Sequence, residues 1–349
     1  MRNLRHFVMA MVGTTFLASN IAWGQDQRPQ DDSVQTEPET PAPVPRKDES
    51  PLAGQFGGPG MGGPGLRAAW YPSRPVSNSL ADLGFVRKSV SGAVPIWKND
   101  GDILLLSAGV RHTSFFTNAI LPDTQRPFPS ELSNINLGLM YIHKFDNGWS
   151  GGLSTTFGSA SDKPFHSIEE INVGFFGFLK VPAKNERDSW TFSIFYSPVG
   201  NVNFPIPGIA YFWKPSDDLQ VSIGIPFSVK WKPIEDLTLT FSYIPVVNVN
   251  ARATYQLTSP LNVYVGFEWL NEAYFLADRA DQRARFLAFE KRLISGIRWD
   301  LTTHAALDFN AGYAFDRYFG EGRNQFSNLQ DQVDISPGAF VGVNLLVKW

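Results

Sequence analysis

The chain has 349 residues, among them 25 prolines, 30 glycines and no cysteine. Its 30 basic and 33 acidic side chains give a formal net charge of −3, which provides no general basic face for nucleic acid. Without a thiol there is no disulfide framework, no thiolate metal site and no cysteine nucleophile. The hydrophobic share of 43% is sufficient for a large folded unit, and the length suits a single all-β barrel.

The first residues have the pattern of a secretory signal peptide. Arg2 and Arg5 form a positively charged start, and an apolar stretch without charge follows from residue 7 to residue 18. Ala22 and Gly24 are small residues at the two positions that a signal peptidase inspects, which makes Gln25 the new N-terminus. The apolar stretch is shorter than the ~20 residues of a membrane-spanning helix. Residues 1–24 therefore predict export without a helical anchor.

A tether is expected between the signal peptide and the folded part. Residues 25–47 are polar with closely spaced prolines, and residues 57–65 consist of glycine and proline apart from Met61. A glycine–proline run supports neither helix nor strand, and it buries too little apolar area to offset its ordering entropy. Residues 25–66 are therefore predicted to be a disordered periplasmic tether, or a proline-rich segment that binds a partner in the cell envelope.

From about residue 67 the hydrophobic pattern changes to a period of two. Apolar residues alternate with small or polar ones in the segments 134–141, 149–157, 171–175, 190–196, 219–225 and 339–349. This alternation predicts β-strands with one apolar face. The longest stretch without charge in this region, residues 189–213, also alternates and contains three prolines, so it predicts two strands and a loop instead of a membrane-spanning helix.

The connections between these segments alternate in length. Tight turns are predicted at 99–101, 146–148, 215–218, 233–236, 258–260 and 300–302, several of them with the Asn-Gly or Asp-Gly steps of short hairpins. Longer connections lie between them, at 117–130, 159–167, 199–207, 277–291 and 316–336. Short turns at one end and long loops at the other are typical of an outer-membrane barrel. Such a barrel must close, because an open edge would leave amides unpaired in lipid.

Tryptophans lie next to the short turns. The predicted interface girdle consists of Trp97, Trp149, Trp190, Trp213, Trp231, Trp299 and the C-terminal Trp349. The amphipathic indole ring is favoured at a membrane–water interface, whereas a soluble β-sandwich would hide its tryptophans in the core. We therefore expect these rings at one height of a transmembrane barrel.

The number of strands is predicted as a range. Fifteen segments from Phe85 to Trp349 qualify as strands, and a further one near residues 66–71 gives 16, an even count as in single-chain bacterial barrels. Segments 219–225 and 227–232 are shorter than the ~9–11 residues of a spanning strand, so counts of 14 and 12 stay open. The predicted fold is all-β: a closed antiparallel up-and-down transmembrane β-barrel of about 14–16 strands, with 12 as the lower limit, over residues 67–349.

Five segments resemble one family of bacterial proteins. They are Asp146-Asn147-Gly148-Trp149-Ser150, Pro164-Phe165-His166-Ser167-Ile168, Ala251-Arg252-Ala253-Thr254-Tyr255, Tyr274-Phe275-Leu276-Ala277-Asp278 and Gly312-Tyr313-Ala314-Phe315-Asp316-Arg317. With these segments, residues 67–349 are similar to an uncharacterised, domain-of-unknown-function family of bacterial outer-membrane β-barrels. The resemblance implies the barrel and its location, and it implies no substrate and no site residue.

The parity of the strands assigns charged side chains to the lumen. If Val263, Val265 and Phe267 face lipid, Glu268 and Glu272 face inward. The same parity gives the full set of lumen or constriction candidates: Lys230, Arg252, Glu268, Glu272, Arg292, Arg298 and Asp308. Two interpretations stay open. The charges either form a salt-bridged filling with cross-strand pairs such as Glu268 with Arg298, or they form a constriction that selects solutes by field and size.

A helix is predicted only at residues 278–292, where Asp281 and Arg285 are four residues apart. The segment is rich in arginine, with Phe286 and Phe289 on one side. Two placements are open for it: a solvated helical cap at the rim beside anionic headgroups, or an inward fold as a constriction or plug.

Two histidine patterns carry the remaining chemistry. His112 and Ser114 share one strand face, and this spacing is similar to that of lipid A deacylase barrels, which add an acidic residue. No local acid is visible, so a polar strand end near the long-loop rim is the preferred interpretation. His166 lies beside three carboxylates and is interpreted as part of a solvated rim and not as a metal site.

These features predict an exported barrel in the bacterial outer membrane, with its tether in the periplasm, that passes small polar solutes passively. The alternative is a closed structural or anchoring barrel whose tether or loops bind a cell-envelope partner, and a lipid-modifying enzyme is a third reading. The expected partners are outer-membrane lipid, small polar solutes and the barrel-assembly machinery, the last through the C-terminal strand that ends at Trp349. We expect no catalytic residue, cofactor, metal or nucleic acid.

Overall fold

A computed structural model describes residues 64–347 except 78, 186, 200–203, 245–247 and 325–326. The predicted signal peptide, most of the predicted tether and Trp349 lie outside the described residues. The described chain contains 17 β-strands and one short 3₁₀ helix, η1 (Ile168–Glu170). None of its helices is long and apolar enough to cross a membrane.

The strands follow one another along the whole described chain. They are β1 (Gly65–Pro75), β2 (Asp82–Lys98), β3 (Asp102–Thr117), β4 (Glu131–Lys144), β5 (Ser150–Ser161), β6 (Ile171–Pro182), β7 (Ser189–Tyr196), β8 (Ile206–Trp213), β9 (Leu219–Gly224), β10 (Phe227–Ile234), β11 (Leu237–Ile244), β12 (Asn248–Thr258), β13 (Leu261–Tyr274), β14 (Arg285–Asp300), β15 (Ala305–Gly322), β16 (Gln330–Ile335) and β17 (Gly338–Val347).

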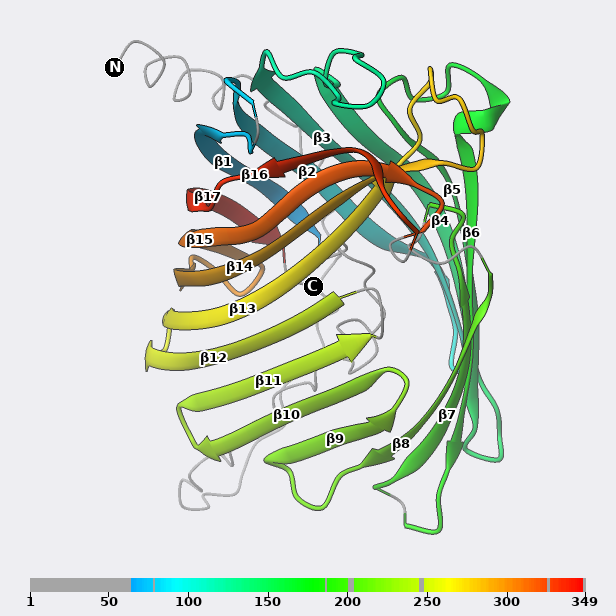
Figure 1. The fold of residues 1–349 in the computed structure, drawn as a ribbon. Coiled ribbons are helices and arrows are strands. Elements are labelled where there is room, and N and C mark those ends of the chain that lie inside the picture. Colours follow the sequence, from blue (N-terminus) through cyan, green and yellow to red (C-terminus); the bar gives the residue numbers. More distant parts are fainter. Residues whose placement is uncertain are drawn as a thin grey trace, which may run out of the picture. The chain divides into compact units, whose positions relative to one another are not determined.

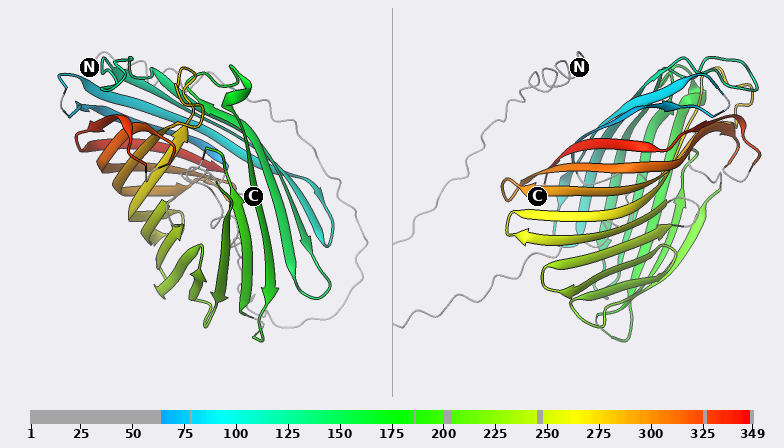
Figure 2. Two further views of the ribbon diagram at one scale, coloured as in Figure 1. Left: turned by 45° about the vertical axis from the view of Figure 1, so that its right-hand side comes forward. Right: turned by 60° about the vertical axis from the view of Figure 1, so that its left-hand side comes forward.

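All strands except β16 form one closed antiparallel ring of 16 (Figures 1 and 2). Each strand from β1 to β14 pairs with the next one, β15 pairs with β17, and β17 closes the ring on β1. β16 pairs with the last part of β15. The prediction of a closed up-and-down barrel is confirmed with 16 strands, and the counts of 14 and 12 are wrong. The first strand begins at Gly65, one residue before the predicted strand near residues 66–71 and two before the predicted start of the barrel at residue 67.

Alternate side chains of the strands face outward and are apolar. Val173, Val265 and Leu293 are each more than half exposed, and similar residues occur all around the ring. The six described tryptophans of the predicted girdle are also on the surface, with exposed fractions between 39% and 51%. A soluble monomer rarely exposes such a continuous apolar surface. The alternating pattern therefore reflects an apolar outer face around a different interior.

The two ends of the ring differ. Short turns join β2 to β3, β4 to β5, β6 to β7, β8 to β9, β10 to β11, β12 to β13 and β14 to β15, and we call this the short-turn end. The opposite, long-loop end carries the connections 118–130, 162–170, 275–284 and 323–329. Two links at the long-loop end are nevertheless very short: Ile225-Pro226 joins β9 to β10, and three residues join β11 to β12. The predicted alternation of short and long connections therefore fails at these two strand pairs.

The predicted helix at residues 278–292 is wrong. Residues 275–284 form an irregular connection, and β14 begins at Arg285. Arg285 donates to the carbonyl oxygens of Pro198 and Arg323 at 2.6 Å, while Asp281 accepts from Arg323 at 2.8 Å. A single pair of opposite charges four residues apart contributes only ~0.2–0.5 kcal/mol to a helix. These contacts with distant segments, together with strand pairing, outweigh it.

A hydrophobic core fills part of the ring at its long-loop end. It includes Phe85, Phe115 and Phe340 from the inner faces of the strands and Leu121 and Phe128 from the connection 118–130. Phe128 packs edge-on against both Phe115 and Phe319, with ring centroids 5.1 and 5.3 Å apart. The connection 118–130 therefore lies inside the mouth of the barrel and not above it.

Candidate functional site: the lumen of the barrel

Ion pairs inside the barrel cross from one wall to another. Arg111 of β3 donates to Glu272 of β13 at 2.6 Å, and Arg87 of β2 lies 3.8 Å from the same carboxylate. Tyr274 donates to Glu272 at 2.9 Å. Strands β3 and β13 are six steps apart along the ring, through β2, β1, β17, β15 and β14. The inner faces of these strands are therefore pressed together, and we call β13–β15, β17 and β1–β3 the packed part.

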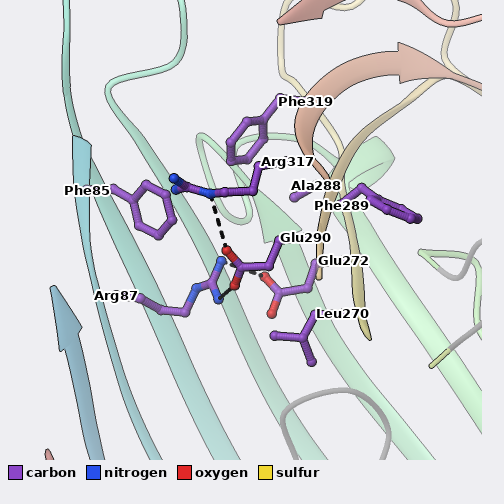
Figure 3. A pocket seen from close by; sticks show the side chains of 9 residues that line it. All are labelled: Phe85, Arg87, Leu270, Glu272, Ala288, Phe289, Glu290, Arg317 and Phe319. Carbon is purple, nitrogen blue, oxygen red and sulfur yellow. Dashed lines mark hydrogen bonds and ion pairs between the residues drawn. The ribbon is translucent and has the colours of Figure 1, made fainter. Parts of the chain in front are cut away.

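Glu290 of β14 is the second hub of the packed part. Arg87 and Arg317 both point at its carboxylate, at 3.5 and 3.6 Å (Figure 3). Tyr71 of β1 also donates to it, at 3.0 Å. The cavity among these side chains has a volume of ≈10 Å³. This is room for about one water molecule, so the space around Glu290 admits no larger solute.

Two further predicted lumen carboxylates have partners on neighbouring strands. Glu268 accepts from Arg292 at 2.7 Å and from Arg252 at 3.2 Å. Asp308 lies 3.5 Å from Arg298. The predicted pair of Glu268 with Arg298 is therefore wrong, because the register places Arg292 directly opposite Glu268. Six of the seven candidates are held in such ion pairs, and the seventh, Lys230, is exposed on β10.

A strap crosses the mouth of the barrel. Residues 275–284, which we call the strap, leave β13 and reach the end of β5, where the amide of Phe275 donates to the carbonyl oxygen of Ala160 at 2.8 Å. Strands β5 and β13 are eight steps apart in either direction around the ring of 16, so the strap joins opposite walls. Arg279 of the strap pairs with the buried Glu170 of η1 at 3.3 Å.

Local hydrogen bonds fix Glu170 for this contact. Burial alone would raise its pKa, but hydrogen bonds from Ser167 and the guanidinium of Arg279 outweigh that effect and hold the pKa below its usual range. Ser167 caps η1, because its hydroxyl accepts from the amide of Glu169 and its own amide donates to Glu170. The carboxylates beside His166 therefore serve the strap. The described residues contain no cluster of three or more His, Asp or Glu that could hold a metal ion.

The connection 118–130 is tied to β16, which pairs with β15 four steps along the ring from β3, through Asp331. The amides of Asp123 and Thr124 donate to this carboxylate at 2.8 and 2.9 Å. Burial alone would raise the pKa of Asp331, but these hydrogen bonds, with those from the Thr124 hydroxyl and Arg126, hold it below its usual range. Sequence reasoning missed this inward loop and considered an inward fold only for residues 278–292, as one of two open placements. The apolar residues Leu121 and Phe128 within a long connection were the available signal.

The rest of the inner wall, from β4 to β12, has a different surface, and we call it the polar part. Its inward side chains are mostly small, hydroxylic or amide-bearing and partly exposed: Ser154, Thr156, Asn172, Thr191, Ser193, Gln220, Ser228, Thr238, Thr240, Ser242, Asn250 and Thr254. Larger inward residues also occur there, among them Phe176, Phe195 and Phe212. The lumen thus has one filled side and one side that water can line.

Two cations on the polar part lack a carboxylate partner among the described residues. Lys230 lies in register between Gln220 and Thr240, and it is exposed. Lys180 of β6 extends its ammonium over the ring of Phe212, 5.5 Å from the ring centre. Arg252 lies in the same row as Thr240 but is paired with Glu268. The fixed charge of the polar part is therefore positive.

His112 and Ser114 lie on the outer face of β3, between the exposed Val110 and Phe116. The Oγ of Ser114 is 3.0 Å from Nε2 of His112, and Nδ1 of His112 is 2.8 Å from Oγ of Ser133. Glu131, which sequence reasoning did not connect with this pair, lies 3.7 Å from Nε2. A catalytic triad needs its acid on the far nitrogen, and a serine hydroxyl occupies that place here.

Comparison with known proteins gives a family. No curated protein matches the sequence significantly. The chain is similar to OccK7 (OpdD) of Pseudomonas aeruginosa at 12% identity and a TM-score of 0.37, covering 82% of this chain and 98% of that one. The COG4313 outer membrane channel of Pseudomonas putida F1 is similar at 9% identity and a TM-score of 0.28, covering 82% of this chain and 97% of that one. The β domain of the Bordetella autotransporter BrkA is similar at 11% identity and a TM-score of 0.28, covering 82% of this chain and 99% of that one.

These similarities are remote and concern the barrel architecture alone. The family match is more direct, because the model of a domain of unknown function (DUF6268) covers residues 114–347. This range includes the last part of β3 and all of β4 to β17. This match confirms the resemblance found in the sequence. The chain belongs to the family defined by the domain of unknown function DUF6268.

Proposed function

We propose that the protein is a bacterial outer-membrane channel through which small polar solutes diffuse along the polar part of the lumen. One observation carries the proposal: the inner wall from β4 to β12 is lined by partly exposed Ser, Thr, Asn and Gln side chains. Barrels of 16–18 strands are wide enough to leave an aqueous channel. The packed part narrows this one and leaves a single polar side.

The proposed location follows from the outer face and the two ends. The exposed apolar belt suits lipid, and the six exposed tryptophans suit the interface near the short turns. Both the start of β1 and the end of β17 lie at the short-turn end, where Gly65 pairs with Leu346. With short turns in the periplasm, the predicted tether extends into the periplasm after signal-peptide cleavage. The C-terminal strand is then the proposed segment for the barrel-assembly machinery.

The test is planar-bilayer conductance of the mature chain, refolded in detergent and shown to be folded by gel mobility before and after boiling. Steady ohmic steps are expected. Thr240→Trp, which adds bulk to the polar part, should reduce the step size. Phe241→Trp changes the neighbouring outward residue and should leave the step size unchanged. Silence from the folded protein would contradict the channel and favour a closed anchoring barrel, the reading that the packed part supports.

The hydrolase reading depends on His112 and Ser114. If the pair is catalytic, His112→Ala abolishes release of acyl chains from outer-membrane lipid without changing folding, because the imidazole is the base that activates the Ser114 hydroxyl. Mass spectrometry of lipid from vesicles with the wild type and the variant decides this point. We expect identical lipid profiles, since no carboxylate orients Nδ1 of the imidazole.

A further inference from the structure

The wall of the barrel is unusually low at β9 and β10. β9 has six residues, whereas β2, β3 and β14 have 16 or 17 (Figure 1). Only four rungs join β9 to β10, from Leu219 opposite Trp231 up to Ser222 opposite Ser228. We call β9, β10 and their link Ile225-Pro226 the low wall.

The edge of the low wall lies near the middle of the membrane. From Trp231, at the proposed periplasmic interface, to Pro226 is five residues, or ~13 Å along the membrane normal at ~3.3 Å per residue and a tilt of ~40°. The apolar band of an outer-membrane barrel is ~25 Å tall. By the same arithmetic, the 14 residues from Trp97 to Leu83 on β2 rise ~35 Å. Among the described residues, β9 and β10 therefore leave the upper part of the wall, toward the outer leaflet, without a strand.

The composition of this edge fits contact with lipid. Ile223 and Ile225 are 51% and 40% exposed, and Phe204, before β8, is 59% exposed. A hairpin tip in water typically carries Asn, Asp or Gly at its central positions. Here glycine occurs before the tip, where Gly224 has φ +140° and a Cβ would lie 2.1 Å from the carbonyl oxygen of Ile209. Gly224 lets the apolar tip pack closely on β8.

An apolar row continues from this edge into the lumen. Phe176, Phe195 and Ile206 pair in register across β6, β7 and β8 and share the inner face. Phe195 is 37% exposed even though it faces inward. The tip of the low wall is at the height of Ile209, because the amide of Ile225 donates to its carbonyl oxygen at 2.9 Å. Ile206 is three residues further toward the long-loop end, so the row borders the part of the wall that lacks a described strand.

The cations of the polar part lie below the apolar row. Lys180 follows Phe176 by four residues on β6, ~13 Å along the strand toward the short-turn end. Lys230 lies one rung above Trp231 on the low wall itself. A molecule that places an apolar chain on the row thus meets unpaired positive charge deeper in the lumen.

We propose that the low wall is a lateral portal through which single-chain amphipathic anions of the fatty-acid type pass between the outer leaflet and the lumen. The single apolar row of Phe176, Phe195 and Ile206 offers a surface for one hydrocarbon chain and not for several chains side by side. The portal uses the lumen of the proposed channel, but it does not require that ions flow through it.

Photocrosslinking tests the portal. The photoreactive residue p-benzoylphenylalanine replaces Phe195 on the inner face, Phe192 on the outer face of the same strand, or Met140 on the inner face behind the high wall. The full mature chain is placed in phospholipid vesicles with tritiated dodecanoate and illuminated. Label is expected at positions 195 and 192 and at least about tenfold less at 140. Label at 192 without label at 195 would falsify the portal.

Two further arms test the chemical class. In the double variant Lys180→Gln/Lys230→Gln, dodecanoate labelling at 195 should fall several-fold, whereas labelling by tritiated dodecanol should not change. An equal fall for both probes, or no fall, contradicts the role of the charges. Labelling at 195 by a two-chain phospholipid as strong as that by dodecanoate shows that bulk lipid fills the opening and contradicts single-chain selection. None of these readouts needs a current, so a closed channel and an absent portal give different results.

Discussion

Glu272 and Glu290 are carboxylates enclosed by arginines, among them Arg87 and Arg111 from strands that are distant along the ring. Removing one charge from a buried ion pair leaves its partner uncompensated, which typically costs ~3–5 kcal/mol. We therefore expect Glu272→Gln to lower the free energy of unfolding by about that amount, because Arg111 loses the carboxylate to which it donates and Arg87 keeps only Glu290.

Urea titration in detergent, followed by gel mobility, measures this change. Asp217→Asn is the matched control, because it removes a carboxylate that also contacts an arginine, Arg187, but lies 82% exposed in a short turn. Exposed pairs contribute less than ~1 kcal/mol. Equal midpoints for wild type and Glu272→Gln would show that the bridge between β3 and β13 does not hold the packed part together.

Lys230 belongs to the polar part of the lumen and not to the packed part. If its charge contributes to the field in the lumen, the wild type prefers anions and Lys230→Glu shifts the reversal potential in a salt gradient toward cation selectivity. Lys88→Glu makes the same change on the outer face of β2 and should leave the reversal potential unchanged. A shift of the same size in both variants would mean that only the net charge of the barrel matters.

The placement of single residues could be predicted from parity, but their partners could not. Alternation alone assigned Glu268 and Glu272 to the inner face, because a strand has only two faces. The partner of Glu272 is Arg111, 161 residues away, and this contact exists because the packed part brings β3 against β13. No local pattern carries that information. The predicted pair of Glu268 with Arg298 was wrong because alternation does not determine the register of β13 against β14, which places Arg292 opposite Glu268.

At the scale of elements, the strap is expected to respond to pH. The pKa of Glu170 is lowered in the folded state, so its contribution to stability is present above the unfolded pKa of ~4.3 and is lost as the pH falls through the lower folded value. Acidification toward pH 3 should therefore release the strap from η1. Glu170→Gln should loosen the strap at neutral pH as well, because the charge that holds Arg279 is gone.

Double electron–electron resonance between spin labels on cysteines introduced at Ala280 and Lys163 measures this release. The sequence has no cysteine of its own, so only these two positions are labelled. A narrow distribution at pH 7 and a broad one at pH 3 are expected for the wild type. The Glu170→Gln variant should give the broad distance distribution at both pH 7 and pH 3. A narrow distribution in the Glu170→Gln variant would show that backbone contacts such as that of Phe275 with Ala160 suffice without the ion pair.

Elements were predictable where a period or a turn signal existed. The alternation in 134–141 and the Asp-Asn-Gly turn at 146–148 correctly define β4, its turn and the start of β5. Residues 285–288 are all buried, with Phe286 against Phe128 of the connection 118–130, and the apolar run from Phe286 to Ala288 therefore shows no period of two. In the sequence, the low wall showed only as two segments shorter than a spanning strand, and their shortness was the reason to leave strand counts of 14 and 12 open.

At the scale of the whole molecule, the barrel depends on β1 to close. β1 pairs with β2 on one side and β17 on the other, so deleting residues 64–75 leaves two open edges in lipid. We expect this deletion to abolish folding, seen as the loss of the heat-modifiable gel band. Deleting residues 25–60 of the predicted tether should leave both the band and the conductance unchanged. A folded product of the first deletion would mean that β2 can close on β17.

The cross-section of a wide barrel in a bilayer deforms easily from a circle to an ellipse, because neighbouring strands can change their angle to one another at little cost. The strap opposes this deformation: it fixes one diameter of the mouth, from β5 to β13, through the contacts of Phe275 and Arg279. With that diameter fixed, lateral pressure from the bilayer cannot change the width of the mouth without breaking those contacts. The aperture above the polar part is therefore set by the chain itself, and it should be the same in thick and thin membranes.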